Sequence, residues 1–169
     1  MLAIMPAMNF GTALSTFVGQ NIGANKMKRI KNGLRSTLIM SSITCIFISI
    51  GIILFGSNLM ALFTNNNEVI KVGKDYLVIV SSFYIIFNIM LVINGLLRGA
   101  GDTIIPMFIS IFSLWLIRLP LAVFLSGKFE ESGIWWSIPI AWTLGTIISY
   151  IYFLSGKWKK KTVVAMGVT

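Results

Sequence analysis

The chain alternates long apolar stretches with short polar links, and this pattern predicts helices that cross a membrane. A helix needs about 20 mostly apolar residues to cross the hydrocarbon core of a bilayer. We therefore predict an all-α integral membrane protein, a bundle of five transmembrane helices. The predicted spans cover approximately residues 1–22, 34–63, 76–97, 104–125 and 133–154. Residues 1–156 form one domain, and residues 157–169 form a basic tail. The second span is longer than needed, so we expect a tilt or a bend at Gly56.

The composition supports a membrane protein and excludes several other classes. Hydrophobic residues make up 56% of the chain, charged residues 11%, and the mean hydropathy is +0.87. A net charge of +9 would suggest nucleic acid in a soluble protein, but these basic residues lie at the ends of apolar runs, so the expected partner is the lipid bilayer. Cys45 is the single cysteine, and histidine is absent, so neither an intrachain disulfide nor a metal site is expected. We find no phosphate-binding loop and no catalytic triad, so we expect neither an enzyme nor a cofactor.

The links between the predicted spans differ in charge, which predicts their orientation. Ten of the fourteen Lys and Arg residues lie in the first link, the third link and the tail, against three in the other two links. By the positive-inside rule the first group faces the cytoplasm, so the N-terminus is outside and the C-terminus inside, in the plasma membrane. No signal peptide is visible. A first span that begins at Met1 with its N-terminus outside is expected for the tail of a longer protein.

Span one carries two stripes of small and polar residues. Residues that recur every four positions and let another helix approach closely are Ala7, Gly11, Ser15, Gly19 and Gly23. A separate polar stripe consists of Asn9, Thr12, Thr16 and Gln20. These polar groups are candidates for lining a substrate cavity. They are equally well explained by hydrogen bonds between helices.

Spans three to five hold further polar positions. Ser81, Tyr84 and Asn88 share one face of span three, which fits either a wet cavity wall or a helix–helix contact. Arg118 is the one charge deep inside a predicted span, and it either reaches the outer surface or forms a cavity charge or ion pair. In span five the small residues recur again, as Ala141, Gly145 and Ser149.

The segment "RGAGDT" between spans three and four predicts a tight cytoplasmic elbow. Gly99 and Gly101 permit unusual backbone angles, and Arg98 suits the end of a helix. We expect Asp102 or Thr103 to cap the next helix, with Pro106 in its first turn.

Three segments in register resemble the C-terminal lobe of the multidrug and toxic compound extrusion (MATE) transporters. They are "TFVGQNIGANKMKRIKNGL", "LFTNNNEVIKVGKDYL" and "INGLLRGAGDTIIP", and the resemblance covers nearly the whole chain. It assigns a motif role to Gly19, Gln20 and Gly23, together with Arg98, Gly99, Gly101 and Asp102 in the elbow. It implies a twelve-helix fold of two lobes that exports small organic cations in exchange for Na⁺ or H⁺.

Under this resemblance the chain supplies helices eight to twelve and lacks the N-terminal lobe. Coupling carboxylates of the family lie in the first lobe, or in the seventh and tenth helices, but span three carries Asn88 and no buried carboxylate. We therefore expect a fragment of a cation/drug antiporter that does not transport alone. Two alternatives are a fragment of a related lipid-linked oligosaccharide flippase and a helical membrane module that only binds a partner.

Overall fold

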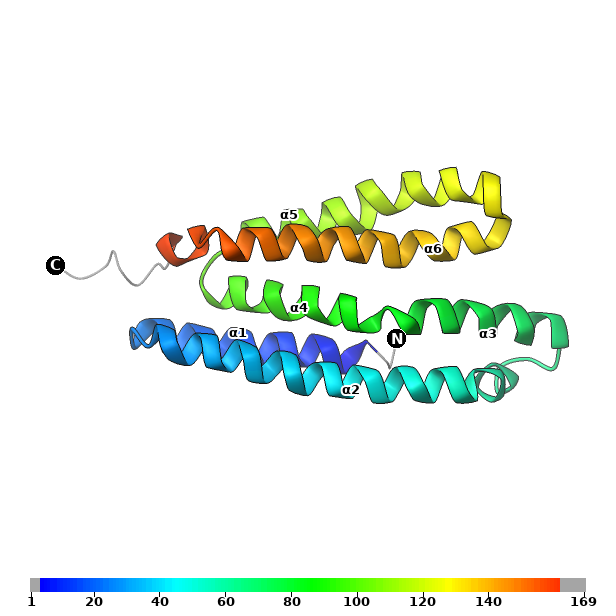
Figure 1. The fold of residues 1–169 in the computed structure, drawn as a ribbon, viewed down its shortest axis with the longest axis horizontal. Helices are drawn as coiled ribbons and strands as arrows, with labels where there is room; N and C mark the ends of the chain where they lie inside the picture. Colours follow the sequence, from blue (N-terminus) through cyan, green and yellow to red (C-terminus); the bar gives the residue numbers. More distant parts are fainter. Residues whose placement is uncertain (1–3, 162–169) are drawn as a thin grey trace.

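The computed structural model describes residues 4–161, and every regular element in that range is a helix. The elements are α1 Met5–Gly23, α2 Met27–Ala61, α3 Asn67–Ser82, α4 Tyr84–Gly99, α5 Ile104–Ile111, the π-helical turn η1 Phe112–Ile117, α6 Arg118–Leu154 and the 3₁₀ helix η2 Lys157–Lys161. The predicted all-α membrane bundle is confirmed (Figure 1). Residues 1–3 of the predicted first span and residues 162–169 of the predicted tail lie outside the described residues.

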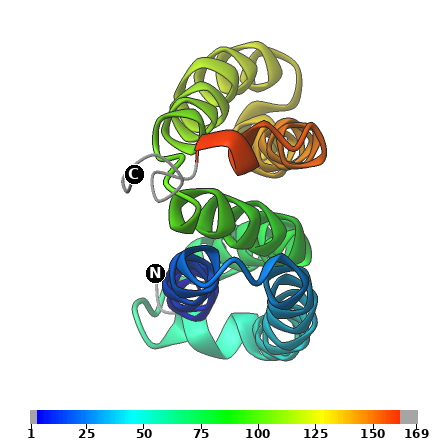
Figure 2. The same cartoon turned by 90° about the vertical axis from the view of Figure 1, so that its left-hand side faces the viewer.

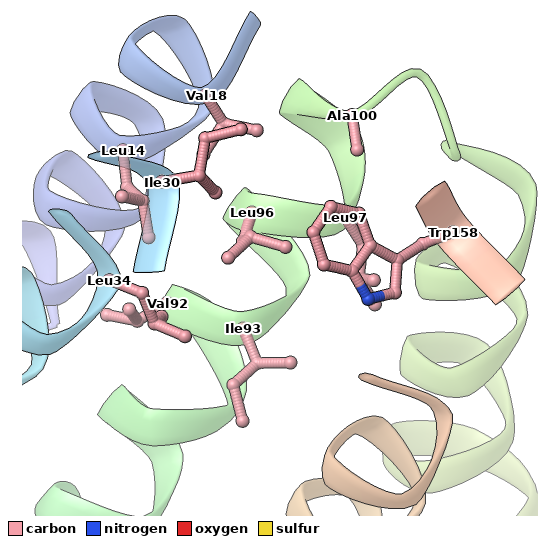
Figure 3. Close-up of a cluster of buried hydrophobic side chains, with 10 residues drawn as sticks. All are labelled: Leu14, Val18, Ile30, Leu34, Val92, Ile93, Leu96, Leu97, Ala100 and Trp158. Atoms are coloured by element: carbon pink, nitrogen blue, oxygen red, sulfur yellow. The ribbon is translucent and has the colours of Figure 1, made fainter. Parts of the chain in front are cut away.

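Helix α4 is the centre of the bundle and packs against α1, α2 and α6. Viewed end-on, α1 and α2 lie on one side of α4, while α5 and α6 lie on the other side (Figure 2). The main apolar core surrounds the second half of α4, where Leu96 and Leu97 are fully buried. Leu14 and Val18 of α1, Ile30 and Leu34 of α2, and Trp158 of η2 close this core (Figure 3).

The number of membrane crossings depends on two breaks in the helices. By length and apolarity, two stretches of the described residues can cross a membrane, Met27–Ala61 and Ile104–Leu154. The bent pair α3–α4 adds a third if its two helices form one span. The 51-residue stretch Ile104–Leu154 doubles back on itself as a hairpin (Figure 1). Its two arms therefore correspond to the fourth and fifth predicted spans. Helix α1 has 19 residues and is not among these spans.

Several predicted boundaries were wrong by many residues. Helix α2 begins at Met27 rather than residue 34, because Asn25 adopts a left-handed conformation (φ 54°) and turns the chain sharply after α1. Four of the five basic residues of the first link thus lie on α2, and the fifth, Lys26, is its N-cap residue. Helix α3 begins at Asn67 rather than residue 76, and the Asn66 side chain caps it by accepting from the Glu68 N–H at 2.9 Å.

The third predicted span is two helices rather than one. Helices α3 and α4 meet at Phe83 and are bent by 47°. The bend separates Ser81, at the end of α3, from Asn88 on α4. The face that the sequence predicts as continuous is therefore interrupted.

The link between the fourth and fifth predicted spans is very short, because the helix is interrupted only at Glu130. The backbone is non-helical at Glu130 (φ 51°, ψ −132°), with helix on both sides. Gly133 allows this tight reversal, because a Cβ there would overlap the Leu125 carbonyl. A tilt or a bend at Gly56 is expected for the long second span; helix α2 is unbroken through Gly56 to Ala61, and a Cβ on Gly56 would lie 3.5 Å from the Lys74 side chain.

The two ends of the bundle differ in which links they hold. One end carries the α1–α2 turn, the α4–α5 elbow and η2, and the opposite end carries the α2–α3 loop and the tip of the hairpin (Figure 1). The basic first link, the third link and the described part of the tail, η2, are thus together at one end, which we call the basic end.

Candidate functional site on the face of α1, α4 and α5

Helices α1 and α4 cross without side chains between their backbones. A Cβ on Gly95 would overlap the carbonyl of Gly11, and one on Gly99 would overlap the carbonyl of Ser15. A Cβ on Gly11 would lie 2.9 Å from the Leu91 carbonyl oxygen. The small residues of α1 therefore have a matching pair of glycines, four residues apart, on α4. This contact fixes how α1 is rotated about its own axis.

That rotation leaves the polar stripe of α1 on the surface. Asn9, Thr12, Thr16 and Gln20 are all exposed, whereas Ala7 and Gly11 on the packing face are buried. The Thr12 hydroxyl donates to the Met8 carbonyl at 3.0 Å, and the Thr16 hydroxyl to the Thr12 carbonyl at 3.4 Å. Both bonds are within the helix, so the hydroxyl oxygens can still accept a hydrogen bond from outside.

A cavity of about 280 Å³ lies between α4 and α5. Its lining residues are Leu91, Asn94, Arg98, Thr103, Pro106, Met107, Ser110 and Ile111. The walls are apolar, and the polar groups are an amide, a guanidinium and two hydroxyls. Arg98 and Thr103 lie toward the basic end, while Asn94 and Ser110 lie deeper along the helices.

Asn94 is the most deeply placed polar residue of this cavity. Its side chain is 2% exposed, and its Oδ1 accepts from the Ser149 hydroxyl of α6 at 2.9 Å. Its Nδ2 has no hydrogen-bond partner within the described residues. A buried donor without a partner costs on the order of 1–3 kcal/mol. The cavity wall therefore holds an amide donor that a water molecule or a ligand oxygen would satisfy.

The other predicted cavity residues lie elsewhere. Asn88 is fully buried, and its Nδ2 donates to the Ser41 hydroxyl of α2 at 2.9 Å. Ser81 is also buried, and its carbonyl accepts from the Ser49 hydroxyl of α2 at 2.7 Å. Both residues thus make helix–helix contacts with α2, which is the second of the two interpretations of this stripe. Tyr84 is half-buried beside Trp142 of α6, with ring centroids 6.1 Å apart.

The elbow after α4 differs from its predicted capping. Thr103 occupies the N-cap position of α5 without a side-chain capping bond, and Asp102 instead accepts from the Tyr152 hydroxyl of α6. Asp102 is 2% exposed, so this bond fixes the elbow onto the last helix. Gly101 has the positive φ (88°) that the sequence predicts, whereas Gly99 is helical and is needed for the contact with Ser15.

The remaining motif residues lie at the basic end. Gly19, Gln20 and Gly23 are exposed on the last turns of α1, and Arg98 is exposed at the end of α4. Arg118 is half-buried directly after η1, far from this end of the bundle. Within the described residues, no three His, Cys, Asp or Glu side chains are grouped so that they could hold a metal ion.

Sequence reasoning did not single out Asn94 or Ser110. The available signal was the i, i+4 spacing of Asn94 and Arg98, which places both side chains on one face of a helix. Ser110 had no comparable signal, because it is a single hydroxyl within an apolar run.

The comparisons with known proteins agree with this architecture. A family model described as MatE matches residues 1–124. The probable multidrug resistance protein NorM of Thermotoga maritima is 31% identical over 96% of this chain and 36% of its own length. The probable multidrug resistance protein YoeA of Bacillus subtilis is 31% identical over 96% of this chain and 35% of its own. Protein DETOXIFICATION 31 of Arabidopsis thaliana is 26% identical over 96% of this chain and 32% of its own.

A solved structure shares the fold. The eukaryotic MATE transporter AtDTX14 matches with a TM-score of 0.80 and 21% identity, over 92% of this chain and 35% of that one. The chain thus spans about a third of the length of the relatives it matches. The family model covers well over half of the chain, which confirms the resemblance seen in the three sequence segments. The chain belongs to the MatE family of multi-pass membrane proteins.

Proposed function

We propose that this chain forms one wall of the substrate pathway of an efflux transporter that exports drugs or small organic cations. The observation that carries the proposal is the open polar face, made of the α1 stripe and the α4–α5 cavity with the unpaired Asn94 amide. Unsatisfied polar groups in hydrocarbon cost on the order of several kcal/mol each. A polar face along apolar helices is therefore better explained by a water-filled path or another protein segment than by lipid.

The open polar face also explains why transport would require a second lobe. Alternating access moves two halves about a shared site. The described helices supply only one side of such a site, so we place the opposing wall on the N-terminal lobe of the complete transporter. The names of the Thermotoga and Bacillus relatives, which describe multidrug resistance, support efflux as the direction of transport.

An inward gradient of Na⁺ or H⁺ drives the proposed export. Helix α4 has Asn88 and Asn94 facing its neighbours, and no carboxylate between Tyr84 and Gly99. We accordingly place the coupling carboxylates outside α4. In the proposed orientation the basic end faces the cytoplasm of a plasma membrane, which leaves the hairpin tip outside.

The test uses a chimera in which this chain replaces the matching third of the Thermotoga relative. Thr12→Val with Thr16→Val keeps the side-chain shape and removes the two hydroxyls from the open face. Thr44→Val is the matched control, because its hydroxyl makes the same local bond, to the Met40 carbonyl at 3.0 Å, on α2.

Ethidium efflux driven by an ion gradient in proteoliposomes is the measurement. We expect the double variant to lower efflux several-fold at unchanged protein level, and the control to be unaffected. Equal efflux by all three proteins, or a well-folded chimera that exports nothing, would contradict the proposal.

A further inference from the structure

A second cavity lies at the basic end, next to η2. It has a volume of about 210 Å³ and lies among α2, α4, α6 and η2. Its lining residues are Ile30, Lys31, Leu34, Leu96, Phe153, Leu154, Trp158 and Lys159. Six of these are apolar and two are lysines. The cavity is therefore an apolar groove with positive charge at its rim.

Most acidic residues of the chain lie away from this groove. Lys28 and Arg35 are three and four residues from Lys31, so all three side chains lie on one face of α2. The first 67 residues contain no acidic residue. Four of the five carboxylates, Glu68, Asp75, Glu130 and Glu131, lie in α3 or at the hairpin tip, toward the opposite end. The fifth, Asp102, lies in the α4–α5 elbow at the basic end, where it accepts from the Tyr152 hydroxyl.

Trp158 makes the wall of the groove rigid. Its side chain is 3% exposed, and its Nε1 donates to the Phe153 carbonyl at 3.0 Å. The Trp158 and Phe153 rings are stacked with centroids 5.8 Å apart, and the Lys159 Nζ lies 5.7 Å from the Trp158 ring centroid. Figure 3 shows the indole beside Leu97, next to the final turns of α4. A fixed aromatic wall keeps the Lys159 stem close to the groove.

We propose that this groove binds the phosphate-bearing headgroup of an anionic phospholipid. Basic pockets between membrane helices on the cytoplasmic side hold such headgroups, and the cytoplasmic leaflet is rich in anionic lipid. The groove is too small for a whole lipid, so the acyl chains continue along the outside of the bundle. Leu154 and Ile151 of α6, which are 63% and 62% exposed, provide that apolar path. This inference rests on the proposed orientation, with the basic end at the cytoplasm, and is independent of the substrate pathway.

The test is lipid binding by the 169-residue chain purified in mild detergent. Dioleoyl-phosphatidylglycerol and dioleoyl-phosphatidylcholine are titrated separately, and the lipid bound per chain is counted by native mass spectrometry. We expect the anionic lipid to bind more tightly. Lys31→Gln with Lys159→Gln should weaken it about thirtyfold, because each lysine near an anionic lipid surface contributes about a factor of five.

Matched controls separate this site from general charge attraction. Lys71→Gln with Lys74→Gln removes the same charge from α3, toward the opposite end, and should leave binding unchanged. Lys31→Arg with Lys159→Arg keeps the charge and should retain lipid binding. Both lysines are exposed, so the variants should fold, which circular dichroism verifies.

Three results would overturn the proposal. The two lipids could bind equally, the α3 control could lose as much binding as the groove variant, or millimolar inorganic phosphate could displace the lipid completely. The last result would assign the groove to a free anion rather than to a lipid.

Discussion

Gly95 of α4 lies so close to Gly11 of α1 that a Cβ atom on Gly95 would overlap the Gly11 carbonyl oxygen. Close approach of backbones through small residues is the main source of helix association in lipid. Gly95→Ala should therefore push the two helices apart and destabilise the chimera by about 1–3 kcal/mol, the usual cost of overpacking.

Gly51→Ala is the control for that change, because a Cβ on Gly51 of α2 meets nothing within 4 Å. There the better helix propensity of alanine should leave stability equal or slightly higher. Thermal denaturation in detergent, followed by size-exclusion chromatography, measures both. Equal melting temperatures for Gly95→Ala and Gly51→Ala would show that the α1–α4 contact is looser than described.

The buried pair of Asn88 and Ser41 gives a second prediction. Asn88→Leu should lower thermal stability of the chimera while efflux per folded molecule stays close to the parent value, because Asn88 contacts α2 and not the open face. Hydrogen bonds between membrane helices contribute on the order of 0.6–2 kcal/mol. Combining Asn88→Leu with Ser41→Ala should cost less than the sum of the two single changes. Loss of efflux at unchanged stability would instead return Asn88 to the substrate pathway.

The bond between Tyr152 and Asp102 predicts a local effect. Tyr152→Phe removes the hydroxyl that Asp102 accepts from and leaves the ring in place. A buried carboxylate that loses a hydrogen bond is destabilised by about 1–3 kcal/mol. Hydrogen–deuterium exchange should therefore accelerate in the elbow, residues 98–103. The amides of α3, near the opposite end of the bundle, serve as an internal reference and should exchange at the parent rate.

Apolar runs were sufficient to predict the fold class and the order of the helices, since a bilayer permits few alternatives. The boundaries of the helices were predicted less well, because local backbone and capping interactions set them. Hydropathy does not reveal the left-handed Asn25, the cap at Asn66 or the break at Phe83. The candidate site was predicted only in part. The partners of Asn88 and Asn94 are Ser41 and Ser149, which are 47 and 55 residues away in sequence. Each amide has one bonded and one unbonded atom, and only the three-dimensional packing shows that Asn94 lines a cavity whereas Asn88 does not line that cavity.

Topology can be tested by cysteine labelling on a Cys45→Ala background. We expect cysteines at Asn25 and Lys157, at the basic end, to react with a membrane-impermeant maleimide only from the cytoplasmic side. Cysteines at Asn65 and Glu131, at the other end, should react only from outside. All four positions are exposed, so burial does not hide them. Labelling of Glu131→Cys from the cytoplasmic side would reverse the proposed orientation.

The open face also predicts how the 169-residue chain behaves without an opposing lobe. Asn9, Thr12 and Thr16 are exposed on a helix that lipid would surround. The Asn9 amide is costly to place in lipid, and the two Thr hydroxyls keep only the bonds that they donate within the helix. We expect the chain to self-associate through α1, and to show no ion-driven ethidium movement in proteoliposomes. Replacing the three residues by Leu, Val and Val should shift the chain toward monomer in crosslinking and light scattering. The Thr44→Val control should leave the oligomer intact. An oligomer that survives the triple change would place the contact on another surface, and gradient-driven efflux by the chain alone would contradict the requirement for two lobes.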